Sequence, residues 1–334
     1  MSVNDGYMWR RSLNALLALT LFGSSFFVTA WLLPQATLRP GGFPGKFKID
    51  ERAQPGADAF FVSRGEHELS HLALYHSIGP SIENARKADI LIIGNSRAQL
   101  GFDEQVWVDS AEALGLRIFN LSVGHADSAQ FARDIMRKHD LRPKVMIANG
   151  GDFLYYGGYS DWAKEVVDMS RWGAIKAYFE YSFAWNVERQ LHRYLPYLDY
   201  FNRWRYGWIH YRSSQTGWWR NTKWPGARYP VKIGMQEGSY KRALFAAAEL
   251  QSELRDWDTL MVMTIVPYRF VLTGHLSFLG EQLGVPYVLP SFEGMETADG
   301  SHLTAESATR ISRTIWSEFI ALPEVREKLA LQGG

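Results

Sequence analysis

The sequence predicts an α/β fold built around a parallel β-sheet, and three observations indicate it. The run at 88–94 (ADILIIG) is short, apolar, rich in isoleucine and bounded by glycine, which is typical of a strand buried on both faces of a parallel sheet. Strand-like and helix-like segments alternate three times from this point, which indicates βα units with right-handed crossovers. The alternation stops at Phe153 and resumes near Gln236.

The individual elements follow from apolar periodicity and turn residues. We expect strands at 88–94, 117–123, 144–149, 259–266 and 286–289. We expect helices at 66–78, 103–114, 128–139, 239–255 and 305–320, with one more between the last two strands. Thr304 is a start signal for the last helix, whose buried stripe would consist of Ala308, Ile311, Ile315 and Phe319.

These elements divide the chain into an interrupted sheet domain and its flanking parts. The domain covers 88–322, with a core at 88–152 and 236–322 and an insertion at 153–235. We expect 1–33 to be a cytoplasmic tip and transmembrane anchor, 34–87 a juxtamembrane linker with one helix, and 323–334 a C-terminal tail.

The anchor is predicted from an uncharged run of 21 residues at 13–33, because about 20 apolar residues span a bilayer as a helix. Arg10 and Arg11 precede the run, and the positive-inside rule keeps that end in the cytoplasm. The protein would then sit in the inner (cytoplasmic) membrane by a single pass, with everything after Pro34 in the periplasm or outside the cell. A cleaved signal peptide is the alternative, since the stretch at 28–30 (VTA) weakly resembles a cleavage site.

The composition excludes several classes of protein. The 334 residues contain no cysteine, which excludes a disulfide framework, cysteine zinc sites, iron–sulfur clusters and a thiol nucleophile. The formal net charge of +1 argues against a dedicated nucleic-acid binder, which usually has a strong basic excess. We expect neither a cofactor nor a metal.

Polar residues and glycines follow each expected strand, and in an open parallel sheet ligands bind beyond the carboxyl ends of the strands. The segments there are GNSR at 94–97, SVGH at 122–125, NGGD at 149–152, PYR at 267–269 and DGSH at 299–302. A serine hydroxyl needs a base, an imidazole needs a carboxylate to fix its tautomer, and an oxyanion needs N–H donors. Each segment alone is weak, since a serine at such a turn is most often only a helix cap. Their order and common position together favour a catalytic site.

These segments resemble the motif blocks of the SGNH (GDSL-like) hydrolase family, over the sheet core but not over the anchor or the insertion. The resemblance implies a flavodoxin-like three-layer sandwich in which Ser96 is the nucleophile, His302 the base and Asp299 its carboxylate. It also implies that the Ser96 and Gly124 N–H groups bind the oxyanion.

The sequence departs from the family pattern at two places. Asn95 stands where the family usually has aspartate, and Gly151 stands where an asparagine side chain normally adds a third oxyanion donor. Either Asn149 supplies that amide from a shifted place or the donor is absent. Loss of one such donor can cost roughly 100- to 1,000-fold in turnover.

The insertion concentrates the aromatic residues and the positive charge. It holds 8 Trp, 11 Tyr and 4 Phe, which is 23 of the 48 aromatic residues, and 12 basic against 6 acidic residues. It would bind a bulky or anionic glycan, lie on the bilayer, or form a small helical subdomain with an aromatic core. Among the aromatic residues of the insertion, Trp218, Trp219 and Trp224 look least like core residues. The candidate substrate contacts are these three tryptophans with Arg97, His125 and Arg269.

An outward-facing, membrane-anchored domain of this type resembles the accessory proteins of polysaccharide O-acetylation and related polymer acylation, which work beside membrane-bound O-acyltransferases. We therefore expect a serine-dependent enzyme that carries an acyl group on Ser96. It would act as an O-acyltransferase towards a glycan hydroxyl or as an esterase towards water. The alternative is a non-catalytic scaffold subunit of a membrane polysaccharide-modification complex.

Overall fold

The computed structural model of the protein describes residues 58–64, 67–124, 129–155, 158–194, 211–220, 228–234 and 241–331. The chain divides into two units, 1–46 with 183–204 and 47–182 with 205–334, and the sheet domain belongs to the second. The expected anchor at 1–33 lies outside the described residues. No helix within the described ranges has the length and hydropathy needed to cross a bilayer.

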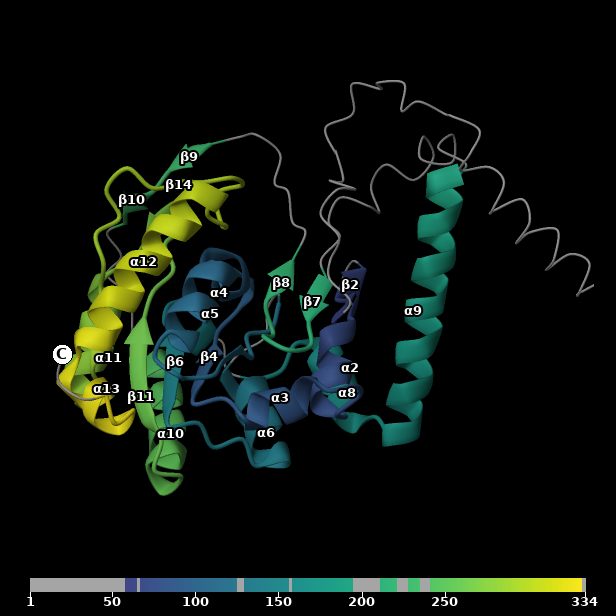
Figure 1. The fold of residues 1–334 in the computed structure, drawn as a ribbon, viewed down its shortest axis with the longest axis horizontal. Coiled ribbons are helices and arrows are strands. Elements are labelled where there is room, and N and C mark those ends of the chain that lie inside the picture. Colours follow the sequence, from purple (N-terminus) through teal and green to yellow (C-terminus); the bar gives the residue numbers. More distant parts are fainter. Residues whose placement is uncertain are drawn as a thin grey trace, which may run out of the picture. The chain divides into compact units, whose positions relative to one another are not determined.

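A five-stranded parallel sheet forms the centre of the domain (Figure 1). Its strands are β4 (Ile90–Ile93), β5 (Ile118–Asn120), β6 (Val145–Asn149), β11 (Leu260–Thr264) and β13 (Tyr287–Val288). They lie in the order β5-β4-β6-β11-β13, which is 2-1-3-4-5 in chain order. Every residue of β4, β5 and β6 is buried, as the apolar runs predicted for strands covered on both faces.

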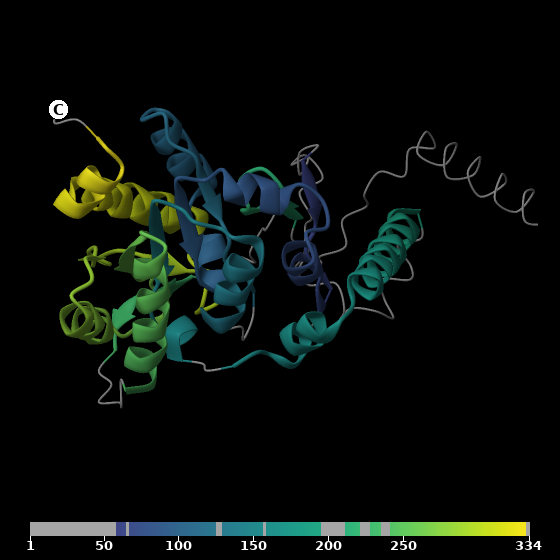
Figure 2. The same ribbon diagram turned by 90° about the horizontal axis from the view of Figure 1, so that it is seen from below.

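Helices cover both faces of this sheet. On one side α12 (Ala305–Ala321) packs against α4 (Ser96–Gly101) and α5 (Glu104–Glu112). On the other side α10 (Lys241–Asp256) packs against α6 (Ala129–His139) and α11 (Gly274–Leu283) (Figure 2). The α/β fold with a parallel sheet is therefore confirmed.

The last helix illustrates how directly the sequence encodes the core. The Thr304 hydroxyl accepts from the Ser307 N–H at 3.3 Å, which caps α12 at its expected start. The four stripe residues predicted for this helix are at most 5% exposed. One face of α12 is therefore held against the sheet by burial of apolar side chains.

Short elements account for the differences from the expected element order. The helix expected at 66–78 is β3 (His67–Glu68), which pairs with β2 (Ser63–Arg64), followed by α2 (Leu69–Tyr75). A further helix, α3 (Ser81–Arg86), precedes β4. The expected C-terminal tail contains α13 (Pro323–Lys328), which starts with proline at its first position.

The insertion is helical only in its first part. It begins with α7 (Asp152–Tyr155), α8 (Asp161–Asp168) and α9 (Arg171–Tyr194) and continues with β7 (Tyr211–Ser213), β8 (Trp219–Arg220), β9 (Tyr229–Pro230) and β10 (Lys232–Ile233). Strand β7 pairs with β1 (Ala59–Phe61) and β8, β9 with β14 (Glu296–Thr297), and β10 with β12 (Phe270–Val271). The expectation of a helical insertion therefore holds for its first part only, because its later part pairs strands with segments outside the insertion.

Candidate active site

The turn between β4 and α4 presents Ser96 at the carboxyl end of the sheet. Asn95 caps α4, and its Oδ1 accepts the Arg97 N–H at 3.1 Å. A Cβ atom on Gly94 would lie 2.7 Å from the Ala98 Cβ and 2.8 Å from the Asn149 Cβ, so the turn requires glycine there. Asn95 therefore supplies the cap that makes Ser96 the first residue of the helix.

His302 connects Ser96 to Asp299. Its Nε2 lies 2.9 Å from the Ser96 Oγ, and its Nδ1 lies 2.8 Å from the Asp299 Oδ2. The other carboxylate oxygen of Asp299 accepts the His302 backbone N–H at 2.7 Å and the Ser301 N–H at 2.8 Å. The structure thus brings together the three residues that the sequence predicted as a triad.

The electrostatics of Asp299 suit it to orient the imidazole. Burial pushes the pKa of its carboxyl up, but the hydrogen bonds from the His302 side chain and backbone and from Ser301 outweigh burial and lower the pKa to about 2. Asp299 is therefore ionised at neutral pH and accepts a hydrogen bond from the Nδ1–H of His302. The Nε2 lone pair then faces the Ser96 hydroxyl, as a general base requires.

The turn that carries Asp299 and His302 is fixed on several sides. The Ala298 N–H donates to the His302 carbonyl at 2.8 Å, and the Arg269 N–H donates to the Gly300 carbonyl at 3.0 Å. Gly300 has a φ of +89°, a backbone conformation that favours glycine. Strand β14, immediately before this turn, pairs with β9 of the insertion, so the insertion supports the triad from outside the core.

Gly124 lies beside the nucleophile turn, because the Val123 N–H donates to the Gly94 carbonyl at 3.0 Å. The Gly124 N–H donates to the Oε2 of Glu68 at 2.8 Å. A Cβ on Gly124 would lie 2.2 Å from that oxygen and 2.8 Å from the Trp219 ring, so any other residue there would have to displace these side chains. Sequence reasoning missed Glu68, which belongs to none of the motif blocks.

The third block differs from the expectation in what its asparagine does. Asn149 ends β6, is buried, and its Oδ1 accepts the Val266 N–H at 2.8 Å, which ties the ends of β6 and β11 together. Gly151 has a φ of +85°, and its Cβ position would meet only the Ile265 side chain, at 3.8 Å. A role for Asn149 or Gly151 at the oxyanion stays a prediction.

Two arginines near the triad make cation–π contacts with aromatic rings. The Arg97 guanidinium lies 4.0 Å from the centre of the Tyr268 ring, and its Nε donates to the Ser301 hydroxyl at 3.2 Å. The Arg269 guanidinium lies 5.0 Å from the Tyr229 ring centre and 5.1 Å from that of Phe270. These contacts keep two positive charges at the edge of the site.

The tryptophans proposed as ligand contacts differ in their burial and position. Trp218 is 1% exposed, and its indole N–H donates to the Phe102 carbonyl at 2.8 Å, which corrects its assignment from ligand contact to core residue. Trp219 is partly exposed beside Gly124. Trp224 and His125 lie outside the described residues.

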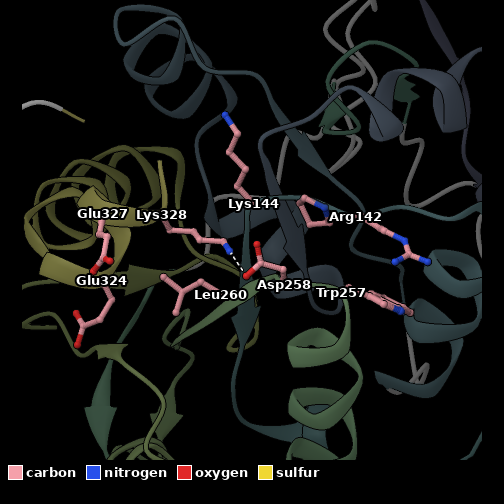
Figure 3. A pocket seen from close by; sticks show the side chains of 9 residues that line it. Arg142, Lys144, Trp257, Asp258, Leu260, Glu324, Glu327 and Lys328 are labelled. Carbon is pink, nitrogen blue, oxygen red and sulfur yellow. Dashed lines mark ion pairs between the residues drawn. The ribbon is translucent and has the colours of Figure 1, made fainter. Parts of the chain in front are cut away.

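A surface hollow of about 650 Å³ lies away from this site, where β6 and β11 begin (Figure 3). Lys328 pairs with Asp258 at 2.6 Å in it, and Lys144 pairs with Asp89 at 2.8 Å. Ser96 follows the carboxyl end of β4, whereas the hollow lies at the amino ends of the parallel strands. The hollow therefore contains no residue of the triad. Within the described part of the chain, no cluster of three or more acidic or histidine side chains could hold a metal ion.

No protein-family model matches the chain, and no curated protein matches its sequence. Among solved structures it is similar to one from Bacteroides fragilis described as a "putative acylhydrolase", at 11% identity and a TM-score of 0.35. The similarity covers 75% of this chain and 95% of that one.

Proposed function

We propose that the protein is a membrane-anchored, extracytoplasmic acyl-ester enzyme of the SGNH (GDSL-like) type that acts through an acyl-Ser96 on a polysaccharide. The observation that carries the proposal is the unbroken hydrogen-bond series from the Ser96 Oγ through the His302 imidazole to the Asp299 carboxylate. The flavodoxin-like strand order 2-1-3-4-5 supports it, because that order places ligands at the carboxyl ends of the strands.

The triad geometry fits acyl transfer in two steps. The Ser96 Oγ attacks the carbonyl carbon of an acyl ester while His302 Nε2 takes the hydroxyl proton. The bond to the leaving oxygen then breaks, and His302 returns the proton to that oxygen, which leaves as an alcohol. A glycan hydroxyl or water next attacks the acyl-serine, gives its proton to His302, and Ser96 regains its proton.

The donors available to the oxyanion favour slow turnover. The capping bonds of α4 engage the N–H groups of Arg97, Ala98 and Gln99 but not that of Ser96, which suits Ser96 as the first donor. The Gly124 N–H would be the second once Glu68 releases it, and Gly151 brings no side-chain amide as a third. An acyl-serine that reacts slowly can persist until a sugar hydroxyl is bound and accepts the acyl group. We therefore favour O-acyltransferase over esterase activity.

The surroundings of the triad support an extended acceptor near a membrane. Arg97 and Arg269 can pair with acidic groups of a glycan, and Tyr229 and Trp219 offer faces for sugar rings.

On α9, Trp172 is 81% and Phe179 is 63% exposed, and exposed aromatic side chains of this kind favour the membrane interface. A membrane-bound O-acyltransferase is the partner that we propose as acyl donor.

The test is covalent labelling of the full chain in detergent with p-nitrophenyl acetate, followed by intact mass and peptide mapping. We expect one acetyl adduct, on Ser96, that Ser96→Ala abolishes. Ser277→Ala removes an exposed hydroxyl on α11 and should leave the adduct unchanged. Absence of any adduct on Ser96 would contradict the proposal.

A non-catalytic scaffold is the second candidate, and the engagement of the Gly124 N–H by Glu68 is the observation that favours it. The two candidates differ in cells that carry only the Ser96→Ala chain. A scaffold would leave polysaccharide acylation unchanged, whereas an acyl-serine enzyme would lose it.

A further inference from the structure

A carboxylate is buried against the backbone N–H of Gly124, and the preceding residue, Val123, donates to the nucleophile turn at Gly94. Glu68 stands immediately before α2 and is only 5% exposed, and its Oε2 accepts the Gly124 N–H at 2.8 Å. The Ser70 hydroxyl donates to its other oxygen, and the His71 Nδ1 lies 3.6 Å from Oε2. Several groups therefore hold this carboxylate on the donor that the proposed reaction would use.

Arg212 provides the opposite charge from the insertion. It is fully buried on β7, and its guanidinium donates to the Asn120 carbonyl at 2.6 Å and to the Ser122 carbonyl at 3.0 Å. Burial lowers the pKa of Arg212 to about 10, against the attraction of Glu68, so the group is still charged at neutral pH. The segment from Asn120 to Gly124 is thus held by a cation at its carbonyls and by an anion at its last N–H.

We infer that Glu68 occupies the second oxyanion donor and thereby restrains acylation of Ser96. This inference rests on the proposed function, in which the Gly124 N–H stabilises the oxyanion. A tetrahedral intermediate places a negative oxygen where such donors point, and the Glu68 carboxylate already fills that position. Until the Glu68 carboxylate is displaced, acylation of Ser96 proceeds without the Gly124 donor, and the negative charge of Glu68 repels the oxyanion.

A purely structural role for residue 68 would not require a negative charge. Any neutral acceptor would satisfy the buried Gly124 N–H, and a glutamine at position 68 could do so through its amide oxygen. The charge balances Arg212, but it also lies where negative charge develops during acyl transfer. Removing the charge while keeping an acceptor therefore separates the two roles.

The test compares acylation of Ser96 by p-nitrophenyl acetate in the full wild-type chain and in Glu68→Gln. We expect the variant to acylate at least about tenfold faster, which is a fraction of the 100- to 1,000-fold that one donor contributes. Glu83→Gln is the matched control, because Glu83 is an exposed acid on α3 that pairs with Arg86 and Lys87, and its rate should equal that of wild type.

Glu68→Ala provides an independent readout, because it vacates the position and leaves Arg212 without its counter-charge. We expect faster acylation than in wild type, and added acetate should slow this variant, but not wild type, by refilling the position beside Gly124. If Glu68→Ala does not fold, the result with Glu68→Gln decides. If Glu68→Gln does not fold, Ser70→Ala decides, because it removes one anchor of the carboxylate and should also accelerate acylation.

The outcomes distinguish this inference from the proposed function. Adduct formation in wild type at a rate that the folded position-68 variants do not exceed would overturn the inference alone. Failure of every chain to form an adduct on Ser96 would overturn both.

Discussion

The Nε2 of His302 lies 2.9 Å from the Oγ of Ser96, although the two residues are 206 positions apart in the chain. The capped turn after β4 fixes the serine, and the turn before α12 fixes the histidine. Their meeting depends on the parallel sheet, which brings the carboxyl ends of β4 and its neighbours to one edge.

Asp299→Asn should abolish most of the acylation of Ser96 without unfolding the protein. An asparagine amide can donate to Nδ1 of His302, which would turn the protonated nitrogen towards Ser96 and remove the base. We expect a loss on the order of 10³- to 10⁴-fold in the rate of adduct formation. Stopped-flow release of p-nitrophenol measures it, and a rate within tenfold of wild type would contradict the assignment of Asp299.

Acid should weaken the wild-type fold more than that of Asp299→Asn. The pKa of Asp299 is about 2 in the folded chain, below its ordinary value of 3.8, because burial raises it but the hydrogen bonds from His302 and Ser301 lower it by a larger amount. A lowered pKa means that the contribution is present above about pH 4 and is lost as the pH falls towards 2. Solvent screens this carboxylate, so the difference should stay below about 1 kcal/mol.

Urea unfolding of both chains at pH 6 and pH 3 measures this difference. The gap in unfolding free energy between wild type and Asp299→Asn should be smaller at pH 3. A gap that is equal at both pH values would show that the Asp299 hydrogen bonds do not stabilise the fold.

Gly151→Asn should restore a third oxyanion donor and accelerate acylation. The position has room, since a Cβ there would meet only Ile265 at 3.8 Å, and asparagine tolerates positive φ better than most residues. We expect about a tenfold gain in rate at a cost of about 1 kcal/mol from the φ of +85°.

Gly151→Ala is the matched control for this gain, because it adds a Cβ at the same positive φ without an amide. Its acylation rate should not exceed that of wild type. Equal acceleration by alanine and asparagine would exclude the amide as the cause.

Trp218→Phe and Trp219→Phe should have opposite effects. Trp218 is a buried core residue that donates to Phe102, so its substitution should cost about 2–3 kcal/mol of unfolding free energy and leave glycan binding unchanged. Trp219 lies partly exposed beside Gly124, so its substitution should change stability little and reduce glycan-dependent fluorescence quenching. Thermal unfolding and glycan titration of each variant measure the two effects, and the reverse pattern would contradict the assignment.

The sequence was sufficient for features that depend on local pattern. The fully apolar run of β4, the stripe of α12 and the order of the motif blocks predicted the sheet, its last helix and the three triad residues. The first two signals each lie within one element, where burial imposes a period on the residues, whereas the triad was implied by the resemblance of several motif blocks to one family.

Features that depend on pairing between distant segments could not be predicted in this way. Glu68 reaches Gly124 across 56 positions, with no periodic signal at either residue. Trp218 lies in a polar stretch of the sequence, but it is buried immediately before β8, which pairs with β7 (Figure 1). The strands of the insertion have only two or three residues, which is too short for an alternating pattern to be recognised.

Trp172 should report contact of α9 with lipid if the proposed membrane location is correct. Trp172 and Phe179 are seven residues apart, so they share one face of the helix, and both are strongly exposed. In full chain reconstituted into vesicles with brominated lipids, Trp172→Phe should remove a measurable part of the tryptophan quenching. Trp257→Phe is the matched control, because Trp257 lines the hollow where β11 begins and should not contribute. Equal loss of quenching in both variants, or none in either, would contradict a membrane-facing α9.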